Sequence, residues 1–366
     1  TRLPPLSGRN RYIKTCWTIN LALPQLPKEN MTEFDCILLT SFGGPEASED
    51  VEPFLRNVAN GRDIPAERLE EVQAQYGLFG GVSPINQQNR DLIAALEEEL
   101  QSRNIELPIY FGNRNWDPYI SDALQNIYDD GKRNVLALVT SAFGSYSGCR
   151  QYQEDLDLAV EGLNAEDLSV EKIRLFWNHP GFFEAMVQRL KSSISEIDND
   201  TIQKTHLAFT AHSIPSAWME TNPYQWQLRD FASQLVDAVA PDMEWDLVFQ
   251  SRSGPPTVPW LEPDIVDHLD SLSAQGVESV IIAPIGFVSD HMEVMFDLDT
   301  EAADHARSLG MKVTRTPTVG VHPTFVSGLG QLIEEKILNQ TPLVAFGEPW
   351  ICEPGCCSVA KRPSSR

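Results

Sequence analysis

Short apolar runs alternate with longer stretches of helical periodicity along this chain of 366 residues, and this rhythm constrains the fold more than any other feature. The runs are continuously apolar, as at 134–141 (NVLALVTS), which is typical of strands buried on both faces of a sheet. Strands separated by helices favour parallel βαβ units with right-handed crossovers. The predicted strands are 35–41, 107–112, 134–141, 172–177, 205–211, 245–250, 278–285 and 311–315. The predicted helices are 84–103, 117–131, 150–162, 180–196, 223–240, 261–275, 291–309 and 322–339.

The same rhythm occurs twice, in two halves of similar length, and therefore predicts two doubly wound α/β domains. We place the N-terminal domain at 31–180, the C-terminal domain at 181–345 and a cysteine-containing tail at 346–366. Sheets of this kind bind ligands at the carboxyl ends of their strands, so we expect a ligand cleft between the domains.

The first thirty residues differ from the rest. They are punctuated by prolines and have no sustained periodicity. Five basic side chains against the single acid Glu29 give this segment a net charge of +4, so the chain's total of −24 leaves −28 for residues 31–366. We interpret residues 1–30 as an unstructured extension, with a mis-assigned start or a transit peptide as the alternatives.

The composition excludes several classes of protein. Charged residues make up 22% and aromatic residues 9%, which excludes a disordered or fibrous chain. The net charge of −24 argues against general nucleic-acid binding and against an anionic membrane surface. No apolar run approaches the roughly 18 residues of a membrane span. Six cysteines are too few for a disulfide scaffold, so we expect a reducing, cytoplasmic location.

A histidine follows the apolar run 205–211 directly. His212 therefore lies at the carboxyl end of a predicted buried strand, where a ligand is expected. Its unperturbed pKa near 6.5 suits proton transfer or metal binding at neutral pH, and a hydrogen-bonded structural histidine is the alternative.

An acidic stripe follows the predicted strand 278–285. It consists of Glu293, Asp297 and Glu301. At 100° per residue these side chains fall within roughly 80° of one helix face. No lysine or arginine occurs between Asp290 and Glu301 to pair with them. Carboxylates beside histidines offer a path for a divalent cation, and a solvated helix face is the alternative reading.

Several motifs, in this order along the chain, resemble those of the ferrochelatases. They are LLTSFGGP at 38–45, GGVSP at 80–84, FGNR at 111–114, TAHSIP at 210–215, the loop 250–260, and FVSDHME at 287–293 with its continuation to Leu298 and Asp299. The resemblance covers roughly residues 34–340. It implies two Rossmann-like domains around a porphyrin cleft, and insertion of Fe²⁺ into a porphyrin with loss of two pyrrole protons.

The resemblance also implies roles for individual residues. His212 and Glu293 match the pair that handles the metal and the protons, on opposite sides of the cleft. The other matches are Asp297 and Glu301 as outer metal-binding residues, Ser83 and Tyr152 as porphyrin contacts, and Arg62, Arg114 and Arg252 as candidate partners of the propionates. The chain departs from the family at Phe42, where many Gram-positive members have a tyrosine that can ligate iron. Iron is then held in another way here, or only from the side of His212.

Four cysteines form a further candidate site. Cys352, Cys356 and Cys357 cluster near the end of the chain, and Cys149 follows the predicted strand 134–141. By themselves these cysteines suggest zinc about as readily as an iron–sulfur cluster. They resemble the ligand set of ferrochelatases that carry a [2Fe–2S] cluster, including actinobacterial ones. This likeness also implies coproporphyrin III as the substrate, with protoporphyrin IX as the alternative.

The sequence thus predicts a ferrochelatase acting in haem biosynthesis, with Fe²⁺ and a porphyrin as its partners. A downstream haem-pathway enzyme is a further candidate partner. A non-catalytic tetrapyrrole or metal carrier of the same fold is the alternative. A hydrolase is disfavoured, because the motif GSYSG at 144–148 has a tyrosine where a nucleophilic serine belongs.

Overall fold

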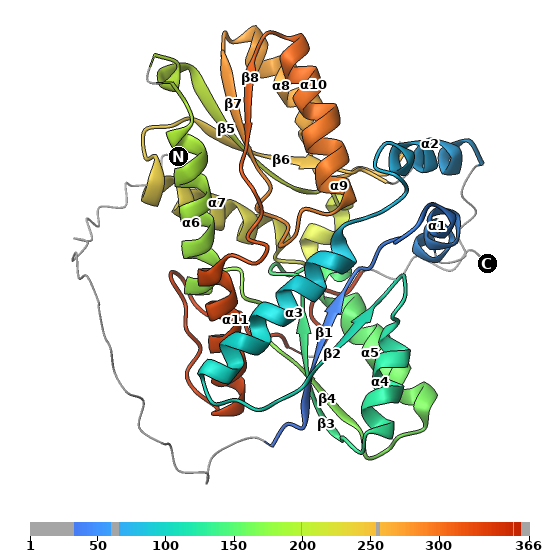
Figure 1. Ribbon diagram of the computed structural model, residues 1–366. Coiled ribbons are helices and arrows are strands. Elements are labelled where there is room, and N and C mark those ends of the chain that lie inside the picture. Colours follow the sequence, from blue (N-terminus) through green and yellow to red (C-terminus); the bar gives the residue numbers. More distant parts are fainter. Residues whose placement is uncertain (1–32, 60–65, 199, 254–256, 354, 360–366) are drawn as a thin grey trace.

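The computed structural model describes residues 33–59, 66–198, 200–253, 257–353 and 355–359, and Figure 1 shows its arrangement. Two four-stranded parallel sheets form the centre of the molecule, with helices packed on their faces. The predicted α/β class with two parallel sheets is therefore confirmed. The predicted extension at 1–30 lies outside the described residues.

The first sheet has the strand order β2-β1-β3-β4. Its strands are β1 Cys36–Ser41, β2 Ile109–Asn113, β3 Asn134–Val139 and β4 Ser169–Lys172. The helices of this half are α1 Val51–Ala59, α2 Ala66–Gly77, α3 Ile85–Ser102, α4 Ile120–Asp129 and α5 Gln151–Leu163. Every β1 residue is buried, because α4 and α5 cover one face of the sheet and α3 covers the other.

The second sheet repeats this plan with the order β6-β5-β7-β8. Its strands are β5 Thr205–His212, β6 Trp245–Gln250, β7 Ser279–Ala283 and β8 Lys312–Arg315. The helices of this half are α6 Pro180–Ser195, α7 Tyr224–Val239, α8 Ile265–Ala274, α9 Met292–Val294, α10 Ala303–Ser308 and α11 Pro323–Ile337. Helices α8 and α10 lie together on one face of this sheet (Figure 1).

One hydrophobic cluster runs through both halves. It joins Leu39 and Leu138 of the first sheet to Phe209 and Ile281 of the second. Helix α11 packs against both α6 and α3 and so connects the halves (Figure 1). The two sheets therefore share one core cluster, and each also packs a separate cluster on its other face.

Four elements differ from the sequence prediction. Helices α1 and α2 were not predicted. Strand β4 occupies 169–172 instead of 172–177, because its pairing with β3 begins at Ser169 and the apolar residues beyond it leave the sheet for the core. The helix expected at 291–309 is not a uniform α-helix, since its middle, Met295–Ala302, forms a wider π-helix.

Candidate functional site

His212 is the last residue of β5 and lies at the carboxyl edge of the second sheet. Its Nδ1 contacts the backbone oxygen of Ser213. A carbonyl oxygen only accepts hydrogen bonds, so Nδ1 carries the proton and the lone pair lies on Nε2. That Nε2 faces Glu293 Oε2 at 3.8 Å. The geometry thus places an imidazole with a free lone pair beside a carboxylate.

The structure corrects one expectation about this pair. His212 and Glu293 were expected on opposite sides of a cleft. A flat ring between them would need a contact of about 3.5 Å on each of its faces, or about 7 Å in all. The observed 3.8 Å is too short, because both side chains belong to the same half: Glu293 lies in α9, just beyond β7. Both groups therefore act from one side.

Asp297 extends this pair along the π-helix. It accepts hydrogen bonds from Ser251 Oγ and, at 3.3 Å, from Gln250 Nε2. Burial, against the lowering effect of the Ser251 hydrogen bond and with the charges of Glu293 and Glu301, raises the pKa of Asp297 to about 7. The structure thus brings the predicted stripe of Glu293, Asp297 and Glu301 into mutual electrostatic contact.

A cation from another strand holds the flank of the stripe. Arg315 in β8 pairs with both Asp290 and Asp299, and Thr318 Oγ1 donates to Asp290 at 3.0 Å. The segment from Asp290 to Glu301, which contains no lysine or arginine, is therefore paired with a cation from β8. Asp299 belongs to this ion-pair network and not to the acidic stripe.

The first half of the chain closes against the same region. Gln88 in α3 exchanges two hydrogen bonds with the backbone of Asp290, at 2.9 and 3.0 Å. Tyr76 of α2 packs with Met292 of α9, and burial together with the charge of Glu293 raises its pKa. Phe42 packs beside this cluster. The site edge of the second sheet is therefore bordered by residues of both halves.

The predicted porphyrin contacts come from several elements, and two of them, Tyr152 and Arg114, contact each other. Ser83 is buried before α3, and its backbone N–H donates to Pro45 O at 2.8 Å. Tyr152 is a buried residue in the first turn of α5, and the Arg114 guanidinium lies 4.8 Å from its ring centroid. Arg114 also pairs with Asp155. The last two are Arg252, which is exposed and donates to Val258 O at 3.1 Å, and Arg62, which lies outside the described residues.

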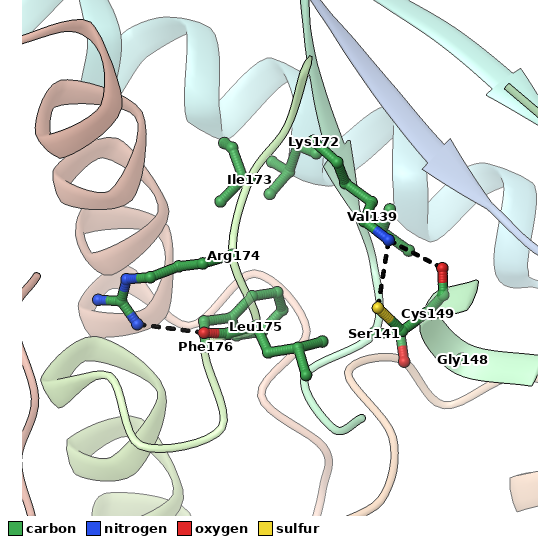
Figure 2. Close-up of a pocket in the computed structure, with 10 residues that line it drawn as sticks. Val139, Ser141, Gly148, Cys149, Lys172, Ile173, Arg174, Leu175 and Phe176 are labelled. Carbon is green, nitrogen blue, oxygen red and sulfur yellow. Dashed lines mark hydrogen bonds between the residues drawn. The ribbon is translucent and has the colours of Figure 1, made fainter. Parts of the chain in front are cut away.

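The four predicted cysteines come together although one lies far from the others in sequence. Cys149 is buried after β3, and Lys172 Nζ donates to its Sγ at 3.2 Å and to its backbone oxygen at 2.9 Å (Figure 2). A hydrogen bond from Cys352, and then the Lys172 charge, lower the pKa of Cys149 to about 6 against the effect of burial. Cys356 contacts both Cys352 and Cys357. The arrangement holds Cys149 close to its thiolate form.

Sequence reasoning missed several residues that shape these sites. His291 caps α9 through Nδ1, and burial lowers its pKa despite the charge of Glu293. Ser251, in the loop after β6, and Lys172, at the end of β4, each reach a partner that is distant in sequence. His291 could have been found from its place in the motif 287–293. Ser251 lies in the motif 250–260, but its bond to Asp297, like the contact of Lys172 with Cys149, has no signal in the sequence, since only the folded topology creates it.

Comparison with known proteins followed from this geometry. A family profile described as Ferrochelatase matches residues 35–337. A ferrochelatase of Rhodopirellula baltica is 47% identical over 334 residues, which covers 90% of this chain and 95% of that protein. A coproporphyrin III ferrochelatase of Streptomyces griseus is 46% identical over 358 residues, covering 91% of this chain and 96% of that protein.

The fold has a relative among solved structures. SirB from Bacillus subtilis, solved with Fe³⁺, superposes with a TM-score of 0.51 at 11% identity, over 83% of this chain and 96% of SirB. Within the described part of the chain, none of the helices is both long and apolar enough to cross a bilayer. On the family profile and on the identity with these relatives over nine-tenths of its length, the chain belongs to the ferrochelatase family.

Proposed function

We propose that this protein inserts Fe²⁺ into coproporphyrin III to form coproheme in haem biosynthesis. The observation that carries the proposal is the row of His212, Glu293 and Asp297 at one sheet edge in a chain of this family. Relatives named coproporphyrin III ferrochelatase, 46% identical in two Streptomyces species, support the choice of substrate. Protoporphyrin IX is the competing substrate.

The chemistry requires three events on one porphyrin face. Two pyrrole protons must leave, Fe²⁺ must lose its water, and the ring must bend so that its nitrogens point at the metal. The Nε2 lone pair of His212 can accept the first pyrrole proton, and the Glu293 carboxylate at 3.8 Å, whose side chain is 43% exposed, can pass that proton to solvent. The neutral imidazole that is restored can then accept the second proton. Binding energy from the ring edge offsets the cost of bending.

The acidic stripe suits delivery of the metal. Asp297 and Glu293 offer oxygen ligands to incoming Fe²⁺, while His212 offers one nitrogen. The set is open, unlike the closed set of four ligands that retains a structural metal. Because Asp297 has a pKa of about 7, it exchanges between a metal-binding carboxylate and a neutral acid near neutral pH. A weakly held ion can pass on to the porphyrin.

The propionates of the substrate call for cations in a chain of net charge −24. Arg252 is exposed beside the site loop that carries Ser251, and is the candidate best placed among the described residues. Arg114 is already paired with Asp155, so a propionate would have to displace that carboxylate. We retain Ser83 and Tyr152 as contacts of the ring, in their buried positions.

We further propose that Cys149, Cys352, Cys356 and Cys357 hold a [2Fe–2S] cluster. Four thiol donors with a lysine beside them fit such a group, whose ligands are thiolates. Tetrahedral zinc would draw all four sulfurs to within about 3.8 Å of one another, given its bond length to sulfur. Zinc takes the same four thiolates and is therefore the competing group, which metal and sulfide analysis distinguishes from the cluster. When bound, the cluster supplies a one-electron redox centre and fastens the tail.

The enzymatic proposal is tested by anaerobic assays with Fe²⁺ and either porphyrin, followed by absorbance. We expect turnover with coproporphyrin III to exceed turnover with protoporphyrin IX. His212→Ala should abolish turnover while porphyrin binding persists. His305→Ala, whose imidazole pairs with Asp270 on α8, is the matched control and should keep wild-type rates. Porphyrin binding without metalated product at stoichiometric enzyme would identify a carrier and refute the proposal.

The cluster proposal has its own readout. Protein purified anaerobically should be red-brown and contain two iron and two sulfide per chain, and Cys149→Ser should lose both. Cys36→Ala is the control, since Cys36 lies buried in β1 and away from the other cysteines. Zinc in place of iron, with no sulfide, would refute this part of the proposal alone.

A further inference from the structure

A second cluster of potential metal ligands lies in the C-terminal half, away from the site described above. It comprises His206 of β5, Asp246 of β6 and His268 of α8. His206 stands six residues before His212 on the same strand, which corresponds to about 20 Å along it. The cluster therefore lies toward the opposite end of the sheet from His212, between the sheet and α8.

The three side chains converge on one point. The Nε2 atoms of His206 and His268 lie 3.1 and 3.5 Å from the same oxygen, Asp246 Oδ2. All three ligand atoms lie within 4.8 Å of one another. Around a tetrahedral zinc ion, neighbouring nitrogen and oxygen ligands stand about 3.4 Å apart, given metal–ligand bonds of about 2.1 Å. The two measured distances bracket that value.

Both histidines are buried with a nitrogen that lacks a hydrogen-bonding partner. His206 is 8% exposed and His268 is 9% exposed, and neither Nε2 makes a hydrogen bond of acceptable geometry. Burial lowers the pKa of each imidazole despite the charge of Asp246. Neutral imidazole is the form that binds metals. Burying two imidazole nitrogens without hydrogen-bonding partners costs folding free energy. The same two nitrogens, with the carboxylate oxygen that they face, can all ligate one cation.

We propose that His206, Asp246 and His268 form a second metal site, specific for a borderline divalent transition-metal ion and best suited to Zn²⁺. Two imidazoles and a carboxylate are the ligand types that such ions prefer. The Asp246 side chain is 53% exposed, so solvent water completes the coordination. The charge of Glu244 also acts on His206 and adds to the attraction for a cation.

The site has a structural role, because its ligands come from three separate elements. A bound ion fastens α8 to β5 and β6 and stabilises the folded state by binding it in preference to the unfolded chain. It is independent of the chelatase reaction, since its ligands lie far from His212.

The test uses Zn²⁺ alone on the full-length protein, with equilibrium dialysis and metal analysis. Asp246→Asn is the main variant, because its exposed side chain can be changed without disturbing the core. We expect Asp246→Asn to bind one equivalent of Zn²⁺ fewer than the wild type, with affinity at this site weaker by at least about 10- to 100-fold, the loss seen when even an outer-shell partner is removed. His268→Asn should behave in the same way.

Asp270→Asn is the matched control. Asp270 lies on the same helix and contacts a histidine, His305 at 2.8 Å, but has no third ligand. It should retain the wild-type stoichiometry. Co²⁺ gives a second readout: the wild type should gain visible absorption bands of a nitrogen- and oxygen-ligated ion, and Asp246→Asn should not. Equal Zn²⁺ stoichiometry and affinity in the wild type and Asp246→Asn would overturn the proposal, whether or not the chelatase assay succeeds.

Discussion

At the scale of single residues, the site depends on how Ser251 tunes Asp297. Its hydrogen bond lowers the pKa of Asp297, which burial raises to about 7. Ser251→Ala removes the hydrogen bond, so the pKa should rise further. If Fe²⁺ uptake needs the carboxylate, the acidic limb of kcat/KM for Fe²⁺ should move up by about one pH unit, the equivalent of one charged hydrogen bond. Ser253→Ala, on an exposed neighbour, should leave the profile unchanged, and an unmoved profile in Ser251→Ala would contradict this role for Asp297.

A second residue-scale prediction concerns acid stability. His179 is 1% exposed, and burial, aided by Arg174 and Arg103, lowers its pKa to about 3. The unfolded chain binds a proton near pH 6.5, so stability is fully present above that pH and is lost as the pH falls toward 3. The loss should approach about 1.4 kcal/mol per pH unit.

His179→Asn tests this dependence. Asparagine can still accept the hydrogen bond that His179 Nδ1 takes from Gly181 N–H at 3.1 Å, but it does not titrate. Urea unfolding at pH 7 and pH 5 should therefore show a smaller pH effect in the variant. An unchanged pH effect would mean that other groups cause the acid sensitivity.

The position of a single residue could be predicted where the neighbouring sequence determines it. His212 and Glu293 both follow apolar runs, so their place at a sheet edge could be inferred from sequence. Their separation of 3.8 Å could not, because it depends on the start of α9 after the β7 loop. The contact of Lys172 with Cys149 was equally inaccessible, since it follows from the pairing of β4 with β3.

At the scale of elements, helices α6 and α11 approach each other closely at Gly181 and Gly328. A Cβ on Gly328 would lie 2.7 Å from Gly181 Cα and 3.2 Å from His179 Nδ1. Gly328→Ala should therefore force the helices apart and cost about 1–3 kcal/mol in unfolding free energy. Gly162→Ala in α5 is the control: its Cβ would meet nothing within 4 Å, and the variant should be neutral or more stable by up to about 1 kcal/mol. Chemical denaturation compares the two, and equal stabilities would contradict the packing argument.

The element predictions succeeded where the apolar pattern was regular. Helix α3 at Ile85–Ser102 and strand β6 at Trp245–Gln250 lie within two residues of expectation. Helices α1 and α2 were missed, because their apolar faces are short and are completed by residues distant in sequence, among them Phe42 and Trp116 of the first half and Met292 and Phe296 of the second. The π-helix Met295–Ala302 was also unpredictable, because no periodicity distinguishes an i+5 turn from an α-helix in eight residues.

At the scale of the molecule, a side chain of the first half holds the site loop of the second. Gln88→Ala removes both hydrogen bonds to the Asp290 backbone and leaves part-buried groups without partners. We expect a loss of about 2 kcal/mol in unfolding free energy. Gln87→Ala is the control, because Gln87 is exposed and its side chain donates to Asp91 on its own helix at 2.8 Å. Equal stability of the two variants would refute the role of Gln88.

The shared core has a consequence for how the protein can be divided. The boundary that we placed near residue 180 separates the two sheets, but the apolar cluster crosses it from Leu138 to Phe209. Two fragments produced by cleavage there would each expose a large apolar surface to water. Each fragment alone should be insoluble, and the two should reassemble when they are mixed. The intact chain should correspondingly unfold in one cooperative transition. Replacing one half by a homologous domain would therefore require matching changes in the apolar residues that face it in the other half.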